Sequence, residues 1–283
     1  MPVSLPPALE LSLDLLRCPT CRARHLHSER GALRCPVGHT FDIARHGYAG
    51  LLTGIPATSG DDAAMVQARN RFLSTGTYAS IREVAARLAA DAVSEQGTVV
   101  DVGCGTGYYL AGLLDQLPGA RGLGLDTSVH ALRSAARAHD RAAAVAWDVF
   151  RSFPLADGVA DVVLDVFAPR NPAEFHRVLR PTGRLIVVRP TGRHLAELRG
   201  RIPAMVTIDP AKELRLHRAL DPFFEAAVTE EVEYSMTLTR PDALDLVAMT
   251  PSARHMSRAD LNDEGFLPDQ VTVSALATAY QPR

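Results

Sequence analysis

The sequence predicts an α/β fold, in which a doubly wound, Rossmann-like and mostly parallel sheet has an antiparallel pair of strands at one edge and follows a small N-terminal metal-binding domain. Three observations support this fold class. Cysteines and a histidine form two knuckles before residue 40, a glycine-rich turn follows an apolar run at 99–102, and strand and helix patterns alternate as far as residue 190. We place the metal-binding domain and its linker at 1–58 and the second domain at 59–283.

The composition shows one local asymmetry. The 283 residues carry a net charge of −2, which does not by itself demand a nucleic-acid partner. Between residues 17 and 45, however, six arginines stand against only two acids, Glu29 and Asp42. There is no apolar run of about 18 residues and no secretory leader, so we expect a soluble, cytoplasmic protein without membrane contact.

The first element is a pair of knuckles with the spacing of a structural zinc site. Cys18 and Cys21 form a CxxC turn, and Cys35 and His39 form a CxxxH turn after thirteen intervening residues. Three thiolates and one imidazole complete a tetrahedral Zn²⁺ site and leave no position for a catalytic water.

Two alternatives stay open at these knuckles. The CxxC pair could instead be a redox dithiol, and His25 or His27 could replace His39 as the fourth ligand. A unit of this length buries little core, so bound metal would supply its folding free energy.

The segment after the knuckles predicts two helices. Residues 61–73 repeat apolar side chains every third or fourth position, and a second helix spans 81–93. Arg69 and Arg71 on the first helix either contact phosphate or are solvated. Tyr78 lies between the helices, where it either packs at a helix start or contacts a ligand.

Alternating glycines follow a short buried-strand pattern. The strand at 99–102 runs directly into Gly103, Gly105 and Gly107, and a helix is predicted over 108–117. Glycine accepts positive φ and lets a ligand lie on the backbone, while the free N–H groups of the helix point at that ligand.

Two acids belong to this predicted nucleotide site. Asp101 lies inside the strand, two residues before the first glycine. The next apolar run, 122–125, ends in Asp126, where nucleotide-binding α/β folds place an acid for the ribose hydroxyls. A helix at 128–139 and a third strand at 142–147 follow.

The string DVGCGTG resembles the cofactor loop of class I S-adenosylmethionine (SAM) methyltransferases. The resemblance implies that the loop, preceded by Asp101 and followed by Tyr109 and Leu110, backs the methionine half of SAM, and that Asp126 holds the ribose. It also implies that Asp148, after the third strand, bonds the adenine amino group, unless Asp148 is a helix cap or turn residue. A nicotinamide enzyme or a purely structural turn is the competing interpretation.

The pattern continues with strands at 161–167 and 184–189 around a helix at 172–179. Ligands bind beyond the carboxyl ends of such parallel strands, so the tip of the first strand, FAPRN from Phe167 to Asn171, points into the active site. The remaining helices and strands close the sheet with an antiparallel edge pair, at 210–220, 229–238, 241–249 and 270–280.

Motifs outside the cofactor loop make the resemblance more specific. The knuckle pair, FDxARxGYxxLL, GDxxxMxxARxxFLxxGxY and DVGCGTGYY together resemble the RlmA/TlrB family of 23S rRNA (guanine-N1-)-methyltransferases, and its Gram-positive branch most closely. The likeness runs from Cys18 to about Met256. It implies a zinc domain that helps grip an RNA hairpin, a SAM-dependent methyltransferase domain, and methylation of one guanine in a 23S rRNA hairpin lining the peptide exit tunnel.

The family resemblance also implies roles for particular residues. Tyr78 and His194, the latter in the segment 191–200, match family residues that contact SAM, although packing roles for both stay open. The loop at 249–255 matches a family loop and is expected to meet RNA.

Guanine N1 keeps its proton at neutral pH, so methylation needs a base or acceptor near N1 and a donor near O6. Arg170 is the candidate donor and Asn171 a weaker one, whereas no residue is identified as the base. Phe167 and Tyr109 either stack on an unpaired or flipped guanine or belong to the core.

Two other functions stay open at this point: a small-molecule SAM methyltransferase with a structural zinc domain, and a non-catalytic RNA-binding module. The sequence determines neither the modified guanine nor the choice between housekeeping and resistance to a tylosin-type macrolide. It permits a homodimer without requiring one.

Overall fold

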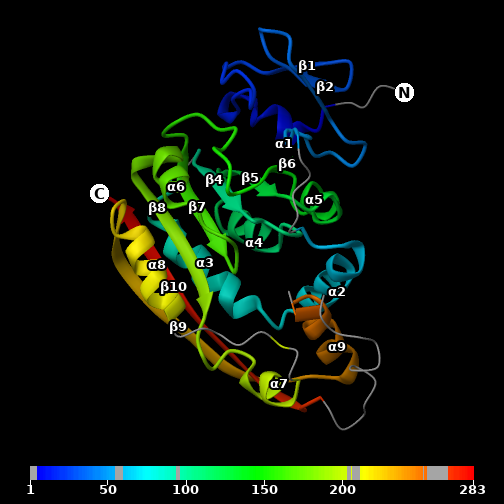
Figure 1. The fold of residues 1–283 in the computed structure, drawn as a ribbon, viewed down its shortest axis with the longest axis vertical. Helices are drawn as coiled ribbons and strands as arrows, with labels where there is room; N and C mark the ends of the chain where they lie inside the picture. The colour runs from blue at the N-terminus through cyan, green and yellow to red at the C-terminus, as the bar shows by residue number, and fades with distance from the viewer. Residues whose placement is uncertain are drawn as a thin grey trace.

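A computed structural model describes residues 5–54, 60–93, 96–202, 205, 211–250, 252–253 and 267–283. Its centre is a seven-stranded sheet with the order β6-β5-β4-β7-β8-β10-β9 (Figure 1). The strands are β4 (Thr98–Val102), β5 (Arg121–Asp126), β6 (Ala142–Ala146), β7 (Ala160–Val166), β8 (Leu179–Pro190), β9 (Phe224–Thr237) and β10 (Gln270–Pro282).

The predicted fold class is confirmed. Strands β6, β5, β4, β7 and β8 pair in parallel, whereas β10 is antiparallel to both β8 and β9. The last strand in the chain therefore inserts between its two predecessors. Strand β9 begins at Phe224, earlier than the predicted start at 229. The prediction missed these first residues because they are exposed at the sheet edge and carry no apolar alternation.

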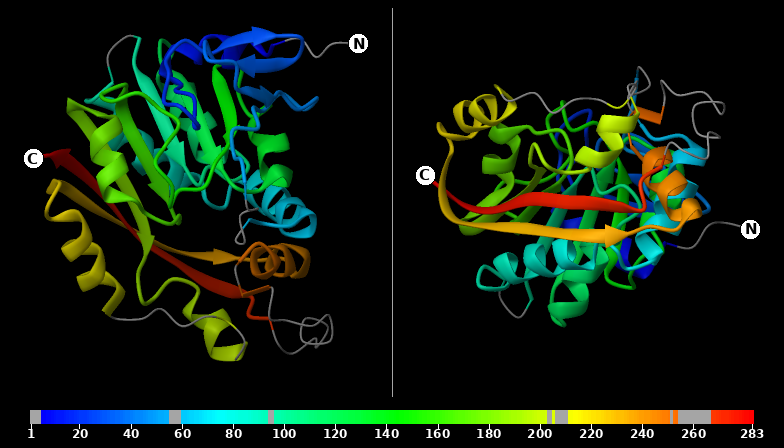
Figure 2. Two further views of the ribbon diagram at one scale, coloured as in Figure 1. Left: turned by 45° about the horizontal axis from the view of Figure 1, so that its top comes forward. Right: turned by 90° about the horizontal axis from the view of Figure 1, so that it is seen from below.

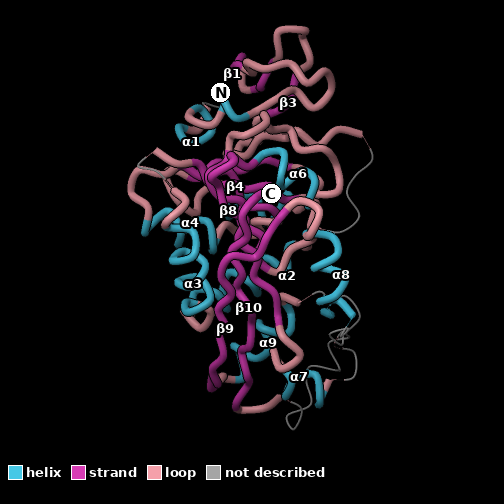
Figure 3. The backbone as a smooth tube through the Cα atoms, turned by 90° about the vertical axis from the view of Figure 1, so that its left-hand side faces the viewer, coloured by secondary structure: helices cyan, strands magenta, loops and turns pink. Residues whose placement is uncertain are grey.

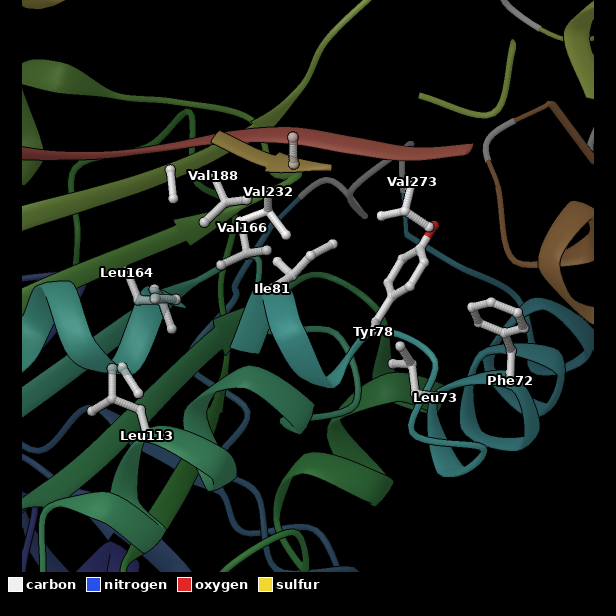
Figure 4. Close-up of a cluster of buried hydrophobic side chains, with 14 of the residues drawn as sticks. Phe72, Leu73, Tyr78, Ile81, Leu113, Leu164, Val166, Val188, Val232 and Val273 are labelled. Atoms are coloured by element: carbon white, nitrogen blue, oxygen red, sulfur yellow. The ribbon is translucent and has the colours of Figure 1, made fainter. Parts of the chain in front are cut away.

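Helices cover both faces of the sheet (Figure 3). Helices α3 (Ala79–Ala90) and α4 (Tyr108–Gln116) share a buried cluster with alternate strand residues such as Leu164, Val166 and Val188 (Figure 4). The opposite side chains of the same strands, such as Val163 and Val187, belong to a second cluster. That second cluster receives α6 (Pro172–Val178) and α8 (Ala211–Leu220).

Three further helices lie towards the carboxyl ends of the parallel strands. Helices α2 (Ala63–Ser74) and α9 (Arg240–Ala248) pack against each other there, and α7 (Ala196–Arg201) follows β8 (Figure 1). Helix α5 (Val129–Ala135) is shorter than the predicted helix at 128–139. No helix in the described part of the chain has the length and apolar character that crossing a membrane requires.

The N-terminal module contains α1 (Pro7–Glu10), the 3-10 helix η1 (Leu13–Leu15) and a sheet of β1 (His27–Glu29), β2 (Ala32–Arg34) and β3 (Thr40–Asp42). It packs onto the sheet of the second domain (Figure 2, left). The N–H of Ala49 donates to the carbonyl of Ala144, and the N–H of Ala146 donates to the carbonyl of Ala49, so the module extends the β6 edge.

The module also replaces a helix. In doubly wound sheets a helix normally connects consecutive parallel strands, yet residues 147–159 between β6 and β7 form none. Module side chains such as Leu16 and Ile43 share one buried cluster with Val100, Leu123 and Val145 on that face. The expected domain boundary at 58 lies outside the described residues and stays a proposal.

Candidate cofactor and catalytic site

The glycine loop joins β4 to α4 at the carboxyl edge of the sheet. Gly103 and Gly107 have φ values of +73° and +82°, which L side chains rarely adopt. A Cβ atom on Gly103 would lie 2.6 Å from the Cβ of Ala168, and one on Gly107 would lie 2.9 Å from the Cβ of Ala138. Both positions therefore require glycine, because the loop lies against the tip of β7 on one side and the residues after α5 on the other.

Asp126 ends β5 and holds this loop. Its carboxylate accepts hydrogen bonds of 2.8 Å from the backbone N–H groups of Gly105 and Ser128. Burial raises the pKa of Asp126, and these two N–H groups oppose the rise. A carboxylate accepts up to about four hydrogen bonds, so Asp126 keeps capacity for the ribose hydroxyls of a nucleotide.

Asp101 in β4 has an unpartnered oxygen. Its side chain is buried, and Oδ2 has no hydrogen-bond partner among the described residues. Burial, and then the charges of Asp165 and Asp126, raise the pKa of Asp101 well above the usual carboxyl range. An orphaned acceptor of this kind beside a glycine loop suits a cationic group of a ligand.

Aromatic rings gather next to the loop, at the tip of β7. The ring centroid of Phe167 lies 5.7 Å from that of His194 and 6.4 Å from those of Tyr78 and Tyr109. Phe167 has a φ of +54°, which is strained for a bulky residue, and it is 38% exposed. A strained, exposed ring at this edge is available to a substrate.

His194 is a neutral hydrogen-bonding residue of this cluster. The N–H of Ser274 donates to its Nδ1 at 3.2 Å, so the neutral ring carries its proton on Nε2 and donates to the Tyr78 hydroxyl at 3.3 Å. Burial, and then the charge of Arg199, lower the pKa of His194 to about 4. His194 is therefore uncharged at neutral pH and orients Tyr78.

Helix α2 brings Arg69 across the glycine loop, a contact that the sequence analysis did not predict. A Cβ atom on Gly105 would lie 3.5 Å from Nη1 of Arg69. Nη2 of Arg69 pairs with Asp61 at 2.6 Å and donates to the carbonyl of Met249 at 2.9 Å. The only sequence signal was the motif that contains both Asp61 and Arg69.

Arg71 on the same helix pairs with Asp245 of α9 through two hydrogen bonds of 2.8 and 2.6 Å. The sequence left both arginines between phosphate binding and solvation. Both form ion pairs within the protein that fasten α2 near α9 and the loop, and the Arg71 side chain is still 61% exposed, so the two alternatives stay open.

The two candidate catalytic residues are partly engaged with the protein. Nε of Arg170 lies 3.0 Å from the carboxylate of Asp165, which is fully buried in β7. Nδ2 of Asn171 donates to the carbonyl of Val149 at 2.9 Å. The role of each at guanine O6 stays a prediction. The buried Asp165 was missed, although an acid inside an apolar strand was a visible signal.

Two other predicted cofactor contacts, Asp148 and Leu110, have contacts within the protein. Oδ1 of Asp148 accepts from the N–H of Phe150 at 3.0 Å, which is the turn geometry that the sequence allowed as an alternative. The side chain of Leu110 is buried, and a Cβ on Gly122 would lie 2.8 Å from its Cδ1. The Leu110 side chain is therefore packed inside the protein, and only its backbone is available to a cofactor.

The two knuckles converge in the N-terminal module. One ligand atom from each of four side chains lies within 4.8 Å of the others: Cys18, Cys21, Cys35 and His39. The Sγ atoms of Cys21 and Cys35 are 3.8 Å apart, close to the separation of about 3.8 Å that Zn–S bonds of about 2.3 Å give at a tetrahedral ion. His25 and His27 are not part of this group. The donor set and its spacing fit a structural zinc ion.

Comparisons with known proteins match both parts of the chain. Residues 16–55 match a family described as "RlmA, N-terminal", and residues 99–183 match a methyltransferase domain. A Micromonospora griseorubida protein, assigned by inference as a 23S rRNA (guanine-N(1)-)-methyltransferase, is 45% identical over 95% of this chain and 98% of its own. The 23S rRNA (guanine(748)-N(1))-methyltransferase of Streptomyces fradiae is 42% identical over 94% of this chain and 96% of its own.

The chain belongs to the RlmA-type family of SAM-dependent 23S rRNA guanine-N1 methyltransferases. A chain from the complex between the Haloferax volcanii Trm112 methyltransferase activator and its methyltransferase partner has a TM-score of 0.53 and 20% identity. The likeness covers 80% of this chain and all of that one, and it shows the fold alone.

Membership of the RlmA-type family agrees with the geometry of both sites. SAM carries an ammonium group and a ribose, which fit the orphaned Oδ2 of Asp101 and the remaining capacity of Asp126. The Cys3His group is the zinc ribbon of the family.

Proposed function

We propose that this enzyme methylates N1 of a guanine in a 23S rRNA hairpin that lines the peptide exit tunnel, and that the modification gives resistance to tylosin-type macrolides. The full-length likeness to the Streptomyces fradiae enzyme, whose name specifies guanine 748, is the observation that carries the proposal. We infer the same nucleotide here. Because ribosomes are the target, we place the enzyme in the cytoplasm.

We propose that the carboxyl edge of the sheet binds SAM, which supplies the methyl group. Asp101 would hold the ammonium group, Asp126 the ribose and Asp148 the adenine. The cofactor contacts that we propose are Tyr78, Asp101, Gly103, Gly105, Gly107, Tyr109, Leu110, Asp126, Asp148 and His194. Residues 1–58 would form the RNA-recognition domain with its linker, and residues 59–283 the methyltransferase domain.

The chemistry left to the chain is positioning and proton removal. N1 lies on the Watson–Crick edge, so the guanine must be unpaired or flipped to reach the site. Phe167 would stack on the base, because its exposed ring adjoins the proposed SAM contacts Tyr78 and His194. Arg170, or Asn171 beside it, would donate to O6 and favour loss of the N1 proton.

Primer extension on 23S rRNA tests the proposed nucleotide. N1 methylation blocks pairing, so reverse transcriptase should stop beside guanine 748 only in RNA from cells that express the enzyme. A stop at a neighbouring guanine would refute guanine 748 as the target, but the proposed N1 methylation would stand. Normal tylosin sensitivity of cells with fully methylated RNA would refute the resistance role alone.

The homodimer permitted by the sequence stays a prediction. Sedimentation velocity of the purified chain tests it directly, and a single species with the mass of one chain would contradict it.

A further inference from the structure

The arginines of the N-terminal module are not all available to RNA. Arg17 and Arg22 bind the segment 147–159, through an ion pair with a carboxylate and a hydrogen bond to a carbonyl. Arg34 pairs with Glu29 at 2.9 Å. Half of the basic patch that the sequence shows is therefore engaged in contacts within the protein.

A second group of cations gathers where the module meets α5. Burial, and then the charges of Arg45, Arg133 and Arg137, lower the pKa of His46, and no carboxylate is among the groups that act on it. Arg133 lies in the last turn of α5, and Arg137 lies in the turn that follows the end of the helix at Ala135. The convergence joins a loop of the module to a helix of the second domain.

Packing fixes this junction. A Cβ atom on Gly47 would lie 3.6 Å from the Cβ of Ala136, so the loop rests on the end of α5. Nε of Arg45 donates to Nε2 of His46 at 3.3 Å, which holds the Arg45 side chain in place. The terminal N–H groups of Arg45 have no recorded partner in the described part of the chain.

The three arginines form no ion pair with a carboxylate among the described residues, and the buried Nε of Arg133 has no hydrogen-bond partner there. Like charges brought together without acids repel one another, and an anion between them removes that cost. Guanidinium groups match phosphate in both charge and geometry.

The junction lies on the way from the zinc ribbon to the proposed active site. Figure 1 shows α5 between the N-terminal module and α2. Helix α5 begins beside Asp126, and Nδ2 of Asn70 in α2 donates to Oγ of Ser134 in α5 at 3.1 Å. An RNA held by the ribbon would pass these arginines before its guanine reached the carboxyl edge.

We propose that Arg45, Arg133 and Arg137 form a phosphate clamp for the RNA backbone, with His46 as the residue that positions Arg45. The clamp rests on the proposed function in so far as the RNA is the substrate. It grips backbone rather than bases, so it contributes affinity and register but no sequence preference.

Charge reversal in the full-length, zinc-loaded enzyme tests the clamp. Arg45→Glu and Arg137→Glu are compared with Arg218→Glu, an exposed arginine on α8 at the other side of the molecule (Figure 1). The dissociation constants of the 23S hairpin and of an unrelated single-stranded RNA are measured from 50 to 200 mM salt. Each clamp variant should weaken both RNAs roughly tenfold and reduce the salt slope by about 1. Arg218→Glu should match the wild type, and calorimetry should give unchanged SAM binding for all three.

The outcomes separate the clamp from the proposed reaction. Wild-type RNA affinity and salt slope in both clamp variants would overturn the clamp, as would a wild-type enzyme that binds neither RNA. If the wild type methylates no RNA but its RNA binding depends on Arg45 and Arg137, the proposed function fails and the clamp stands.

Discussion

Single side chains at the carboxyl edge are held in states that cost the folded protein free energy. Asp101 is buried without a partner for Oδ2, and Phe167 has a positive φ. Such strain persists where the surrounding structure enforces it, and it clusters at functional sites. The motif predicted that Asp101 matters, whereas nothing in the sequence could show the backbone conformation of Phe167, which depends on its tertiary contacts.

Asp101→Asn tests the buried carboxyl. Burial raises its folded-state pKa above the unfolded value of about 4, so the apo protein loses stability as the pH rises from that value to the folded pKa, at about 1.4 kcal/mol per pKa unit. At pH 8 the apo variant should therefore melt no lower than the wild type, while its SAM affinity falls on the order of tenfold. Thermal denaturation and calorimetry measure the two effects, and unchanged SAM affinity would exclude Asp101 from the cofactor site.

Phe167→Ala tests base stacking. Loss of a stacked base costs about 1–3 kcal/mol, so kcat/KM for the hairpin should fall by roughly tenfold to a hundredfold. Phe167→Tyr should keep most of the wild-type kcat/KM, because tyrosine retains the aromatic ring. Neither substitution should change SAM affinity by more than about twofold. A Phe167→Ala enzyme as fast as the wild type would place this ring outside the substrate site.

At the scale of elements, short continuous runs of apolar residues located the parallel strands well. The runs before Gly103 and Asp126 became β4 and β5, because strands buried on both faces leave a continuous apolar signal. The start of β9 at Phe224 was not predictable in this way, since that part of the edge strand is exposed. The absence of a helix between β6 and β7 could not be predicted either, because the N-terminal module, a distant part of the chain, covers that face of the sheet instead.

Gly103→Ala should disable the cofactor loop. The new Cβ would lie 2.6 Å from that of Ala168 in a backbone conformation with φ of +73°. We expect a loss of about 1–3 kcal/mol in unfolding free energy and no measurable SAM binding. Gly192→Ala is the matched control, since nothing lies within 4 Å of its Cβ position and its φ is not positive. Chemical denaturation measures the unfolding free energy of both variants, and titration measures their SAM binding. Normal SAM binding by Gly103→Ala would contradict the account of the loop.

At the scale of the whole molecule, the zinc ribbon and the SAM domain form one folded body. The spacing of the cysteines predicted the ribbon and its four ligands, but not that Leu16 and Ile43 would cover the sheet in place of a helix. Spacing reports local chelation, whereas docking depends on surfaces that the fold creates only when complete.

Zinc removal should therefore destabilise the SAM domain as well as the ribbon. His39→Ala should lower the melting temperature of the whole chain and weaken SAM binding, because the ribbon covers Val100 and Leu123 of the cofactor-bearing strands. His27→Ala, an exposed histidine outside the ligand group, should do neither. Two independent melting transitions, together with unchanged SAM binding in His39→Ala, would show that the ribbon does not stabilise the SAM domain.

The most direct test is methyl transfer by the purified, zinc-loaded enzyme from labelled SAM to the 23S rRNA hairpin, followed by mass spectrometry of the digested RNA. We predict one methyl group per hairpin, on N1 of a single guanine, and an initial rate about tenfold lower with Asp101→Asn at limiting SAM. Label on a different atom or base, or no label in any ribosomal RNA, would contradict the account.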